Sequence, residues 1–313
     1  MATEIMNSQN VRLIKDVAQE AGIDSEALEL YGKYKAKINL DFYEKVKQNP
    51  KGKLVFVTCI TPTPAGEGKT LTSIGLAQAF GKLGKKVGLC LREPSLGPVF
   101  GTKGGATGGG MAQLFPMEDI NLHFTGDLHA ISSAHNLMAA IIDNHIFRGN
   151  ELDIDVRRPR WRRVMDMNDR TLRELLPVTE NNIYGSTGFD ITASSEIMAI
   201  LALSDSIKDL KKRLSRAIVA YDSKKRPIWG DKLGIIDSQA MLLKDAIKPN
   251  LVQTLEGQPV FVHCGPFANI AHGNSSVIAT KLAMSLFDYT ITEGGFAADL
   301  GAEKFFDIVC PSN

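Results

Sequence analysis

Long apolar runs, closely spaced cysteines and an excess of charge of one sign are all missing from this chain of 313 residues. No apolar stretch reaches the roughly 20 residues that a membrane-spanning helix needs, and the first residues lack the basic and apolar regions of a signal peptide. The four cysteines, Cys59, Cys90, Cys264 and Cys310, are far apart and form no CxxC pair. We therefore predict buried free thiols in a reducing cytosol, and a cytoplasmic protein without a membrane partner.

The charges of the chain are balanced, with 36 Lys and Arg residues against 35 Asp and Glu residues. Such a chain has no net field that would attract nucleic acid. Its one basic cluster, residues 157–163, lies among Glu151, Asp153, Asp155 and Asp166, which partly cancel the charge of the arginines. This segment therefore favours a solvated face or a subunit contact over nucleic-acid binding.

Strand and helix patterns alternate along the chain, which has 44% hydrophobic residues and so can build a large core. Strands are expected over residues 54–60, 86–91, 119–124, 217–221, 259–264, 289–292 and 306–310, and helices over 10–21, 70–83, from 127 onward, 237–246 and 275–286. This order predicts an α/β fold: a parallel sheet with helices on both faces and a P-loop NTPase-like nucleotide-binding core. No linker divides the chain cleanly. We predict one domain over residues 1–313, with residues 1–50 as an N-terminal helical segment packed on it.

The turn between the strand at 54–60 and the helix at 70–83 carries the strongest chemical signal, because it reads TPTPAGEGKT over residues 61–70. Strand, glycine-rich turn, Lys-Thr and helix is the order that a phosphate-binding loop requires. Glycines let the backbone approach phosphate oxygens, and the N-terminus of a helix offers unpaired N–H groups to an anion. Lys69 would reach the terminal phosphates of ATP, and the Thr70 hydroxyl would bind Mg²⁺. The nucleotide-binding candidates are Thr63 (where the usual pattern has glycine), Pro64, Ala65, Gly66, Glu67, Gly68, Lys69 and Thr70.

Three further candidates lie outside this turn. Arg92 opens a second glycine-rich stretch, residues 92–110, at the end of the strand at 86–91. Ligands of parallel sheets bind beyond the carboxyl ends of the strands, and a guanidinium can hold a carboxylate or phosphate through two hydrogen bonds. His263 ends another apolar strand and is either a proton acceptor or a histidine satisfied by backbone hydrogen bonds. Asp127 precedes an apolar helix and is either a magnesium ligand or a helix N-cap.

Six motifs together resemble formate–tetrahydrofolate ligase (10-formyltetrahydrofolate synthetase). They are TPTPAGEGKT, LREPSLGPVFGTKGGATGGGMAQLFPMEDINLHFTGD, MDMNDR, GFDITASSEIMAIL, VHCGPFANIAHGNSS and TEGGFAADLGAEKFFDI, and they span nearly the whole chain. The resemblance implies an ATP-dependent enzyme that couples formate to N10 of tetrahydrofolate through formyl phosphate, with release of ADP and phosphate. It also implies a cytosolic homotetramer helped by a monovalent cation. The chain corresponds to the N-terminal portion of such an enzyme, so a C-terminal truncation is expected.

The resemblance and the loop context together give roles to the candidates. Lys69 is expected to bind the phosphates and Arg92 to bind formate and later formyl phosphate. Glu93 is expected to orient Arg92, and His263 is the fourth catalytic candidate. Two other functions stay open at this point: a regulatory P-loop ATPase, and an incomplete fragment that only binds nucleotide or needs a C-terminal partner chain. A dinucleotide-dependent dehydrogenase is disfavoured, because Leu71 stands where the third glycine of that fingerprint belongs.

Overall fold

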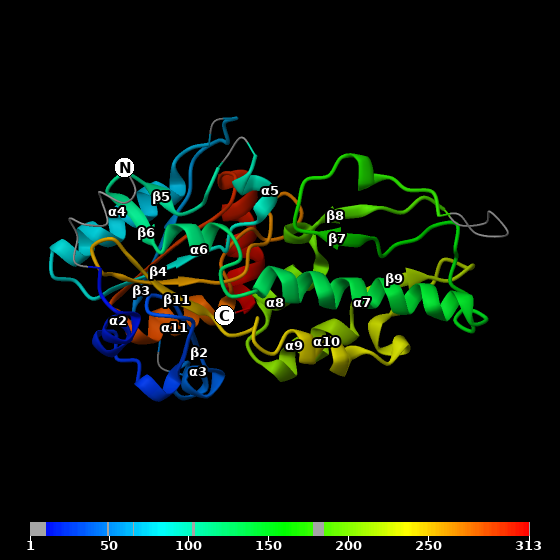
Figure 1. The fold of residues 1–313 in the computed structure, drawn as a ribbon, viewed down its shortest axis with the longest axis horizontal. Helices are drawn as coiled ribbons and strands as arrows, with labels where there is room; N and C mark the ends of the chain where they lie inside the picture. The colour runs from blue at the N-terminus through cyan, green and yellow to red at the C-terminus, as the bar shows by residue number, and fades with distance from the viewer. Residues whose placement is uncertain (1–10, 49, 65, 102–103, 178–184, 313) are drawn as a thin grey trace. The chain divides into compact units, whose positions relative to one another are not determined.

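The computed structural model describes residues 11–48, 50–64, 66–101, 104–177 and 185–312. The chain divides into two compact units, whose elements are labelled in Figure 1. The sheet unit comprises Met1–Thr125 and Lys248–Asn313, and the helical unit comprises Gly126–Ile247. None of the helices in the described ranges combines the length and the apolar character that crossing a membrane requires.

A nine-stranded sheet forms the sheet unit. Its main path runs through β1 (Leu28–Leu30), β2 (Ala36–Ile38), β11 (Asn250–Thr254), β12 (Pro259–Val262), β4 (Val87–Leu91), β13 (Tyr289–Glu293) and β3 (Lys53–Val57), and β6 (Ala112–Phe115) joins β11 to β5 (Gly108–Gly109). Only β12, β4, β13 and β3 are mutually parallel. The other pairs are antiparallel, so the expected parallel sheet is in fact a mixed one. The short connection from β11 to β12 explains one of these pairs, because only antiparallel neighbours can be joined by a tight turn.

Helices cover both faces of the parallel part, as predicted. On β4, Leu89 packs in one core cluster with Ile74 of α4 (Lys69–Lys82). The next residue, Cys90, donates its thiol hydrogen to the carbonyl oxygen of Ala279 in α11 (Val277–Leu286) at 3.4 Å. Because successive strand residues point to opposite faces, α4 and α11 lie on opposite sides of the sheet (Figure 1).

The N-terminal segment, expected to be helical, also contributes to the sheet. It contains α2 (Ile14–Glu20) and α3 (Leu40–Val46), but β1 and β2 lie between them and extend the sheet through β11. One domain over residues 1–313 with this segment packed on it stays a prediction.

Two predicted strands are wrong. Residues 119–121 fall in α6 (Met117–Asn121) and the rest of that segment is a turn, whereas residues 306–309 fall in a π-helical turn, Phe305–Val309. In the first segment Ile120 and Phe124 are buried, and in the second Phe305 and Val309 are buried. A spacing of four fits both periods, but Leu122 and Asp307, midway between the buried residues of each pair, are exposed, which a buried strand face would not allow.

The four cysteines are free thiols, as predicted. Cys90 and Cys264 are buried. The prediction of burial is wrong for the other two thiols, since Cys59 is half-buried and Cys310 is exposed.

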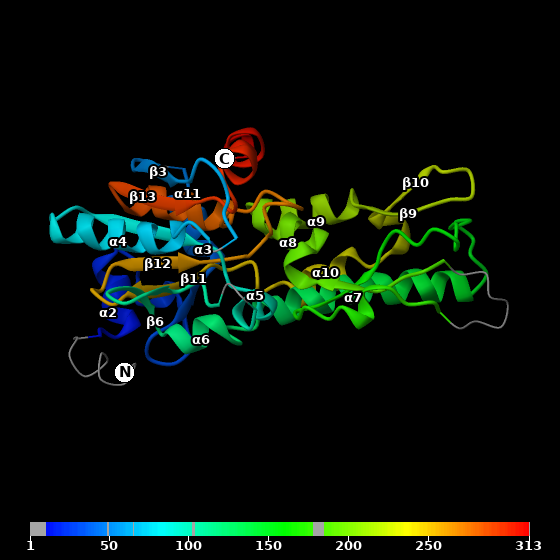
Figure 2. The ribbon, with the colours of Figure 1, turned by 90° about the horizontal axis from the view of Figure 1, so that it is seen from above.

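The helical unit is built around α7 (Asp127–Phe147), the long green helix of Figure 2. Its other elements are α8 (Glu196–Leu203), α9 (Ile207–Ser215), α10 (Ile236–Leu242), the parallel pair β7 (Arg163–Met165) and β8 (Phe189–Ile191), and the antiparallel pair β9 (Ile218–Tyr221) and β10 (Pro227–Trp229). Buried polar bonds hold these elements to α7. Gln239 of α10 donates to the carbonyl oxygen of Ala134 at 3.0 Å. A hydrogen bond of 2.7 Å joins Nδ1 of His135 to the hydroxyl oxygen of Ser195, the N-cap of α8.

Candidate active site

The carboxyl ends of β12, β4, β13 and β3 lie at one edge of the sheet, because these strands are parallel and adjacent. Glu293, the last residue of β13, is in register with Val57, the last residue of β3. In the same way Val262 ends β12 in register with Leu91 at the end of β4. The residues that follow these strands therefore meet at one place, which is where open parallel sheets bind their ligands.

The predicted phosphate loop connects β3 to α4 at this edge. The helix begins at Lys69, one residue before the predicted start. Its N-cap, Gly68, has a φ of 73°, and Gly66 has a φ of 85°. Both values lie in the left-handed region that glycine adopts readily and other residues rarely do. The strand, turn and helix context of a phosphate loop is present, and nucleotide binding at the loop stays a prediction.

Thr63 closes the turn in place of the usual glycine. Its hydroxyl donates to the carbonyl oxygen of Gly66 at 3.1 Å, and its backbone N–H donates to Oε1 of Glu67 at 2.5 Å. Pro64 lies exposed in the same turn, whereas Ala65 lies outside the described residues. The departure from the usual pattern therefore adds one hydrogen bond to the loop, that of the Thr63 hydroxyl, because a glycine would also offer the backbone N–H.

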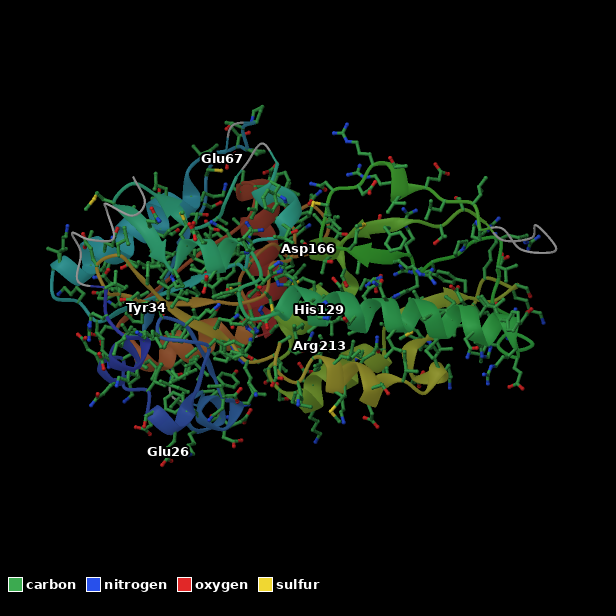
Figure 3. The ribbon with its side chains drawn as sticks, in the orientation of Figure 1. Glu26, Tyr34, Glu67, His129, Asp166 and Arg213 are labelled. Atoms are coloured by element: carbon green, nitrogen blue, oxygen red, sulfur yellow. The ribbon has the colours of Figure 1, made fainter. Side chains whose placement is uncertain are left out.

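Lys69 is held inside the loop by its own neighbours. Its ammonium group pairs with Oε2 of Glu67, whose side chain stands on the loop in Figure 3. This bond, followed by the N–H of Thr63, keeps the pKa of the Glu67 carboxyl below its ordinary value. Lys69 Nζ also lies 3.7 Å from the sulfur of Cys59. A phosphate that binds Lys69 would therefore replace Glu67 as its partner.

Glu293 joins the phosphate loop to the next strand end. The Thr70 hydroxyl donates to Oε2 of Glu293 at 2.9 Å. The other carboxylate oxygen, Oε1, lies 3.9 Å from Nη2 of Arg92. Glu293 is only 5% exposed, so its charge is held away from bulk water between these two partners. The structure thus places Thr70 and Arg92 on either side of a carboxylate that was not predicted.

Arg92 lies at the end of β4, where the chain packs tightly against the loop after β12. Its Nη1 donates to the carbonyl oxygen of Pro266 at 3.2 Å. The backbone N–H of the next residue, Glu93, donates to the carbonyl oxygen of Cys264 at 2.6 Å. A Cβ on Gly265 would collide with the carbonyl oxygen of Glu93, so glycine is required there. Glu93 is buried, and its orienting role stays a prediction.

A family model described as formate–tetrahydrofolate ligase matches residues 1–313. The chain belongs to the formate–tetrahydrofolate ligase family. Membership in this ligase family agrees with a site in which a phosphate-type loop and an arginine flank one carboxylate.

Glu293 is the site residue that sequence reasoning missed in this family member. The available signal was an acidic residue at the end of an apolar strand, directly followed by Gly294 and Gly295. An acid at such a position faces the ligand edge of a parallel sheet. Its partner Thr70 lies 223 residues away in the chain, so no local pattern could connect the two.

His263 is completely buried at the end of β12. Its Nδ1 lies 2.6 Å from the hydroxyl of Ser276, and the same hydroxyl accepts from the N–H of Ala279 as the N-cap of α11. The ring therefore fixes the strand end to the start of the next helix. This arrangement favours the structural reading of His263, and its catalytic role stays a prediction.

Asp127 is the first residue of α7 and belongs to the helical unit. The N-cap of that helix is Gly126, not Asp127, although a carboxylate in the first turn still stabilises the helix dipole. His129, labelled in Figure 3, is exposed on the same helix. The role of Asp127 as a magnesium ligand stays a prediction.

The arginine-rich segment of the helical unit is largely paired with acids. The pairs are Arg157 with Asp155, Arg160 with Glu196, Arg162 with Asp190 and Arg163 with Asp143. Four of its arginines thus satisfy local carboxylates, which leaves little basic surface for a polyanion.

Proposed function

We propose that this chain carries out the reaction of its family, the ATP-dependent formylation of tetrahydrofolate at N10 through formyl phosphate. The observation that carries the proposal is the contact of Glu293 with both Thr70 and Arg92. A loop suited to phosphates and a guanidinium suited to a carboxylate therefore lie on two sides of one buried group. Phosphoryl transfer from ATP to formate requires this kind of neighbourhood, because catalysis of that step depends on positioning and charge stabilisation.

On the nucleotide side, the backbone of Gly66 and Gly68 and the start of α4 would receive the phosphates. Lys69 would leave Glu67 and bind the terminal phosphate, where its positive charge offsets the charge that develops during transfer. The exchange replaces the ion pair of Lys69 by another, while the Glu67 carboxylate keeps the backbone N–H of Thr63 as a partner.

The residues present also fit a magnesium ion. Thr70 and Glu293 offer a hydroxyl and a carboxylate oxygen, and Mg²⁺ usually takes one or two protein oxygens together with phosphate oxygens and water. The described residues contain no group of three or more His, Cys, Asp or Glu side chains suited to a metal, which is consistent with a shell completed by substrate. Asp127, which the sequence predicts as a ligand beside Thr70, belongs to the helical unit, and its part in metal binding stays a prediction. When bound, the ion would neutralise phosphate charge.

On the formate side, Arg92 would hold the carboxylate with one oxygen directed at the γ-phosphorus. That oxygen forms the new P–O bond as the bond to ADP breaks, which gives formyl phosphate. The lone pair of N10 then attacks the formyl carbon, phosphate leaves, and N10 loses its proton. His263 is the proposed acceptor of that proton or the group that steadies the formyl oxygen.

The test is ADP release by the purified chain with MgATP alone, with formate, and with formate and tetrahydrofolate. We expect release that depends on both substrates and is accompanied by 10-formyltetrahydrofolate. Lys69→Ala and Arg92→Ala should abolish it. Formate-independent turnover would instead support a regulatory ATPase, and nucleotide binding without turnover would support a binding-only fragment or one that needs a partner chain.

Family membership also leads us to propose a homotetramer, activation by a monovalent cation and a cytosolic setting. Light scattering coupled to gel filtration tests the first. Titration of activity with potassium chloride against a tetramethylammonium control tests the second.

A further inference from the structure

The loop over residues 265–275, between β12 and α11, is fixed to the site from three sides. Arg92 donates to one of its carbonyl oxygens, as described above. Lys304 Nζ donates to the carbonyl oxygen of Ala268 at 2.5 Å. The backbone N–H of Gly295, just beyond β13, donates to the carbonyl oxygen of Gly273 at 2.9 Å. The side chains of this loop are therefore held next to Arg92 by rigid backbone contacts.

His272 lies in this loop with an unsatisfied ring. Its side chain is only 2% exposed, and its Nε2 has no hydrogen-bond partner in the part of the chain that the structure describes. Burial, and then the charges of Arg92 and Lys304, lower the pKa of the ring to about 4. His272 is thus a neutral imidazole beside two cations, and leaving a buried polar group unpaired costs about 1–3 kcal/mol.

Two other buried atoms of the same edge also lack partners among the described residues. They are Nε of Arg92, which is a donor, and Oδ1 of Asn274, which is an acceptor. The orientation of the Asn274 amide is fixed, because its Nδ2 donates to the carbonyl oxygen of Glu293 at 3.2 Å. Buried polar groups in native proteins are nearly always paired, and a group of exceptions in one place indicates a partner that binds there.

We propose that His272 is a substrate-binding residue that completes, with Arg92, a subsite for a small carboxylate or acyl phosphate anion. An anion supplies oxygen acceptors for the Arg92 and His272 N–H groups, and a water molecule retained with it supplies a donor for Asn274. A neutral imidazole adds a hydrogen bond without a third positive charge next to Arg92 and Lys304. The proposal rests on the proposed function, since it assigns a further residue to the formate side of the same site.

The test compares formate binding and thermal stability of the complete chain in three variants. His272→Leu keeps the volume and removes the polar atoms. It should weaken formate binding about tenfold, the effect of one lost hydrogen bond, and raise Tm by about 2 °C, because the unpaired nitrogen is gone. His272→Gln restores an N–H donor and should recover part of the affinity. Ile270→Ala, at an exposed position of the same loop, is the matched control and should change neither quantity.

Formate affinity is measured by isothermal titration calorimetry, with inorganic phosphate as a second anion. If His272→Leu binds both anions as tightly as the unmodified chain, the proposal is wrong. It is also wrong if His272→Leu lowers Tm and His272→Gln restores stability but not affinity, because that pattern describes a structural histidine. Failure of the unmodified chain to bind either anion refutes the subsite. Binding that depends on His272 in a chain without ligase turnover would refute the proposed function alone.

Discussion

Acidification from pH 7.5 to pH 5 should destabilise the helical unit through one residue, His135. Its Nε2 lies 2.8 Å from the carbonyl oxygen of Arg162, which can only accept, so Nε2 carries the hydrogen. Its Nδ1 must then accept from the hydroxyl of Ser195 at 2.7 Å. The ring also stacks on Trp161 with 4.6 Å between the ring centres. Both nitrogens are hydrogen-bonded in the neutral state, and a second proton would place a positive charge on a buried ring.

Burial lowers the pKa of His135 from 6.5 to about 4. The unfolded chain therefore binds a proton at a higher pH than the folded chain does, so stability is complete above about pH 6.5 and falls as the pH drops toward 4. Each pKa unit corresponds to about 1.4 kcal/mol, which gives a loss of about 2 kcal/mol at pH 5 and about 3.4 kcal/mol well below pH 4.

The assay is urea unfolding at pH 7.5 and pH 5.0, followed by the fluorescence of the buried Trp161 in a Trp229→Phe background. His135→Gln is measured in the same background. It should be less stable at pH 7.5 because its hydrogen bonds are poorer, but it should lose about 2 kcal/mol less than the parent on acidification. Other titrating groups act in both proteins and cancel in this comparison. Equal losses in the two proteins would refute the assignment of a neutral, buried ring.

Three further predictions concern the site. Glu293→Gln and Thr70→Ala should each raise the Kd of MgATP about tenfold. The double variant should raise it far less than the product of the two single increases, because the two side chains act as one unit. Calorimetric Kd increases that multiply would contradict this prediction. Glu67→Gln should tighten ATP binding roughly three- to tenfold, since the nucleotide no longer competes with an internal anion for Lys69; an unchanged Kd would show that the ion pair does not oppose binding. Gly265→Ala should cost about 1–3 kcal/mol of stability, because the added Cβ meets backbone, and a Tm equal to that of the parent would disprove the close approach.

The parts of the site that sequence predicts are those with local signals. The phosphate loop depends on a strand, a glycine-rich turn and a helix that are contiguous in the chain, and α4 begins within one residue of its predicted start. Arg92 is predicted because it directly follows a recognisable strand. Predicting Glu293 as a site residue requires knowing that β13 lies between β3 and β4, and this strand order is a property of the whole sheet. No short sequence motif indicates the strand order.

The same distinction explains the errors in the fold. In the segments around Ile120 and Phe305, apolar residues are frequent enough to satisfy both a strand and a helix pattern, and only burial in the folded chain decides between the two periods. The antiparallel outer strands were missed for a different reason. β2 pairs with β11, and these strands lie on opposite sides of the whole helical unit in the sequence.

The two sides of the candidate site differ in how their polar groups are satisfied before any ligand binds. On the nucleotide side, Lys69 is paired with Glu67, and Thr70 donates to Glu293. ATP must therefore displace internal partners, and its net binding energy is reduced by the bonds that it breaks. On the anion side, Nε of Arg92 and Nε2 of His272 have no such partners among the described residues, so an anion gains hydrogen bonds there without breaking any. We therefore expect ATP binding to move side chains of the phosphate loop, and formate binding to leave the backbone of the loop over residues 265–275 where it is.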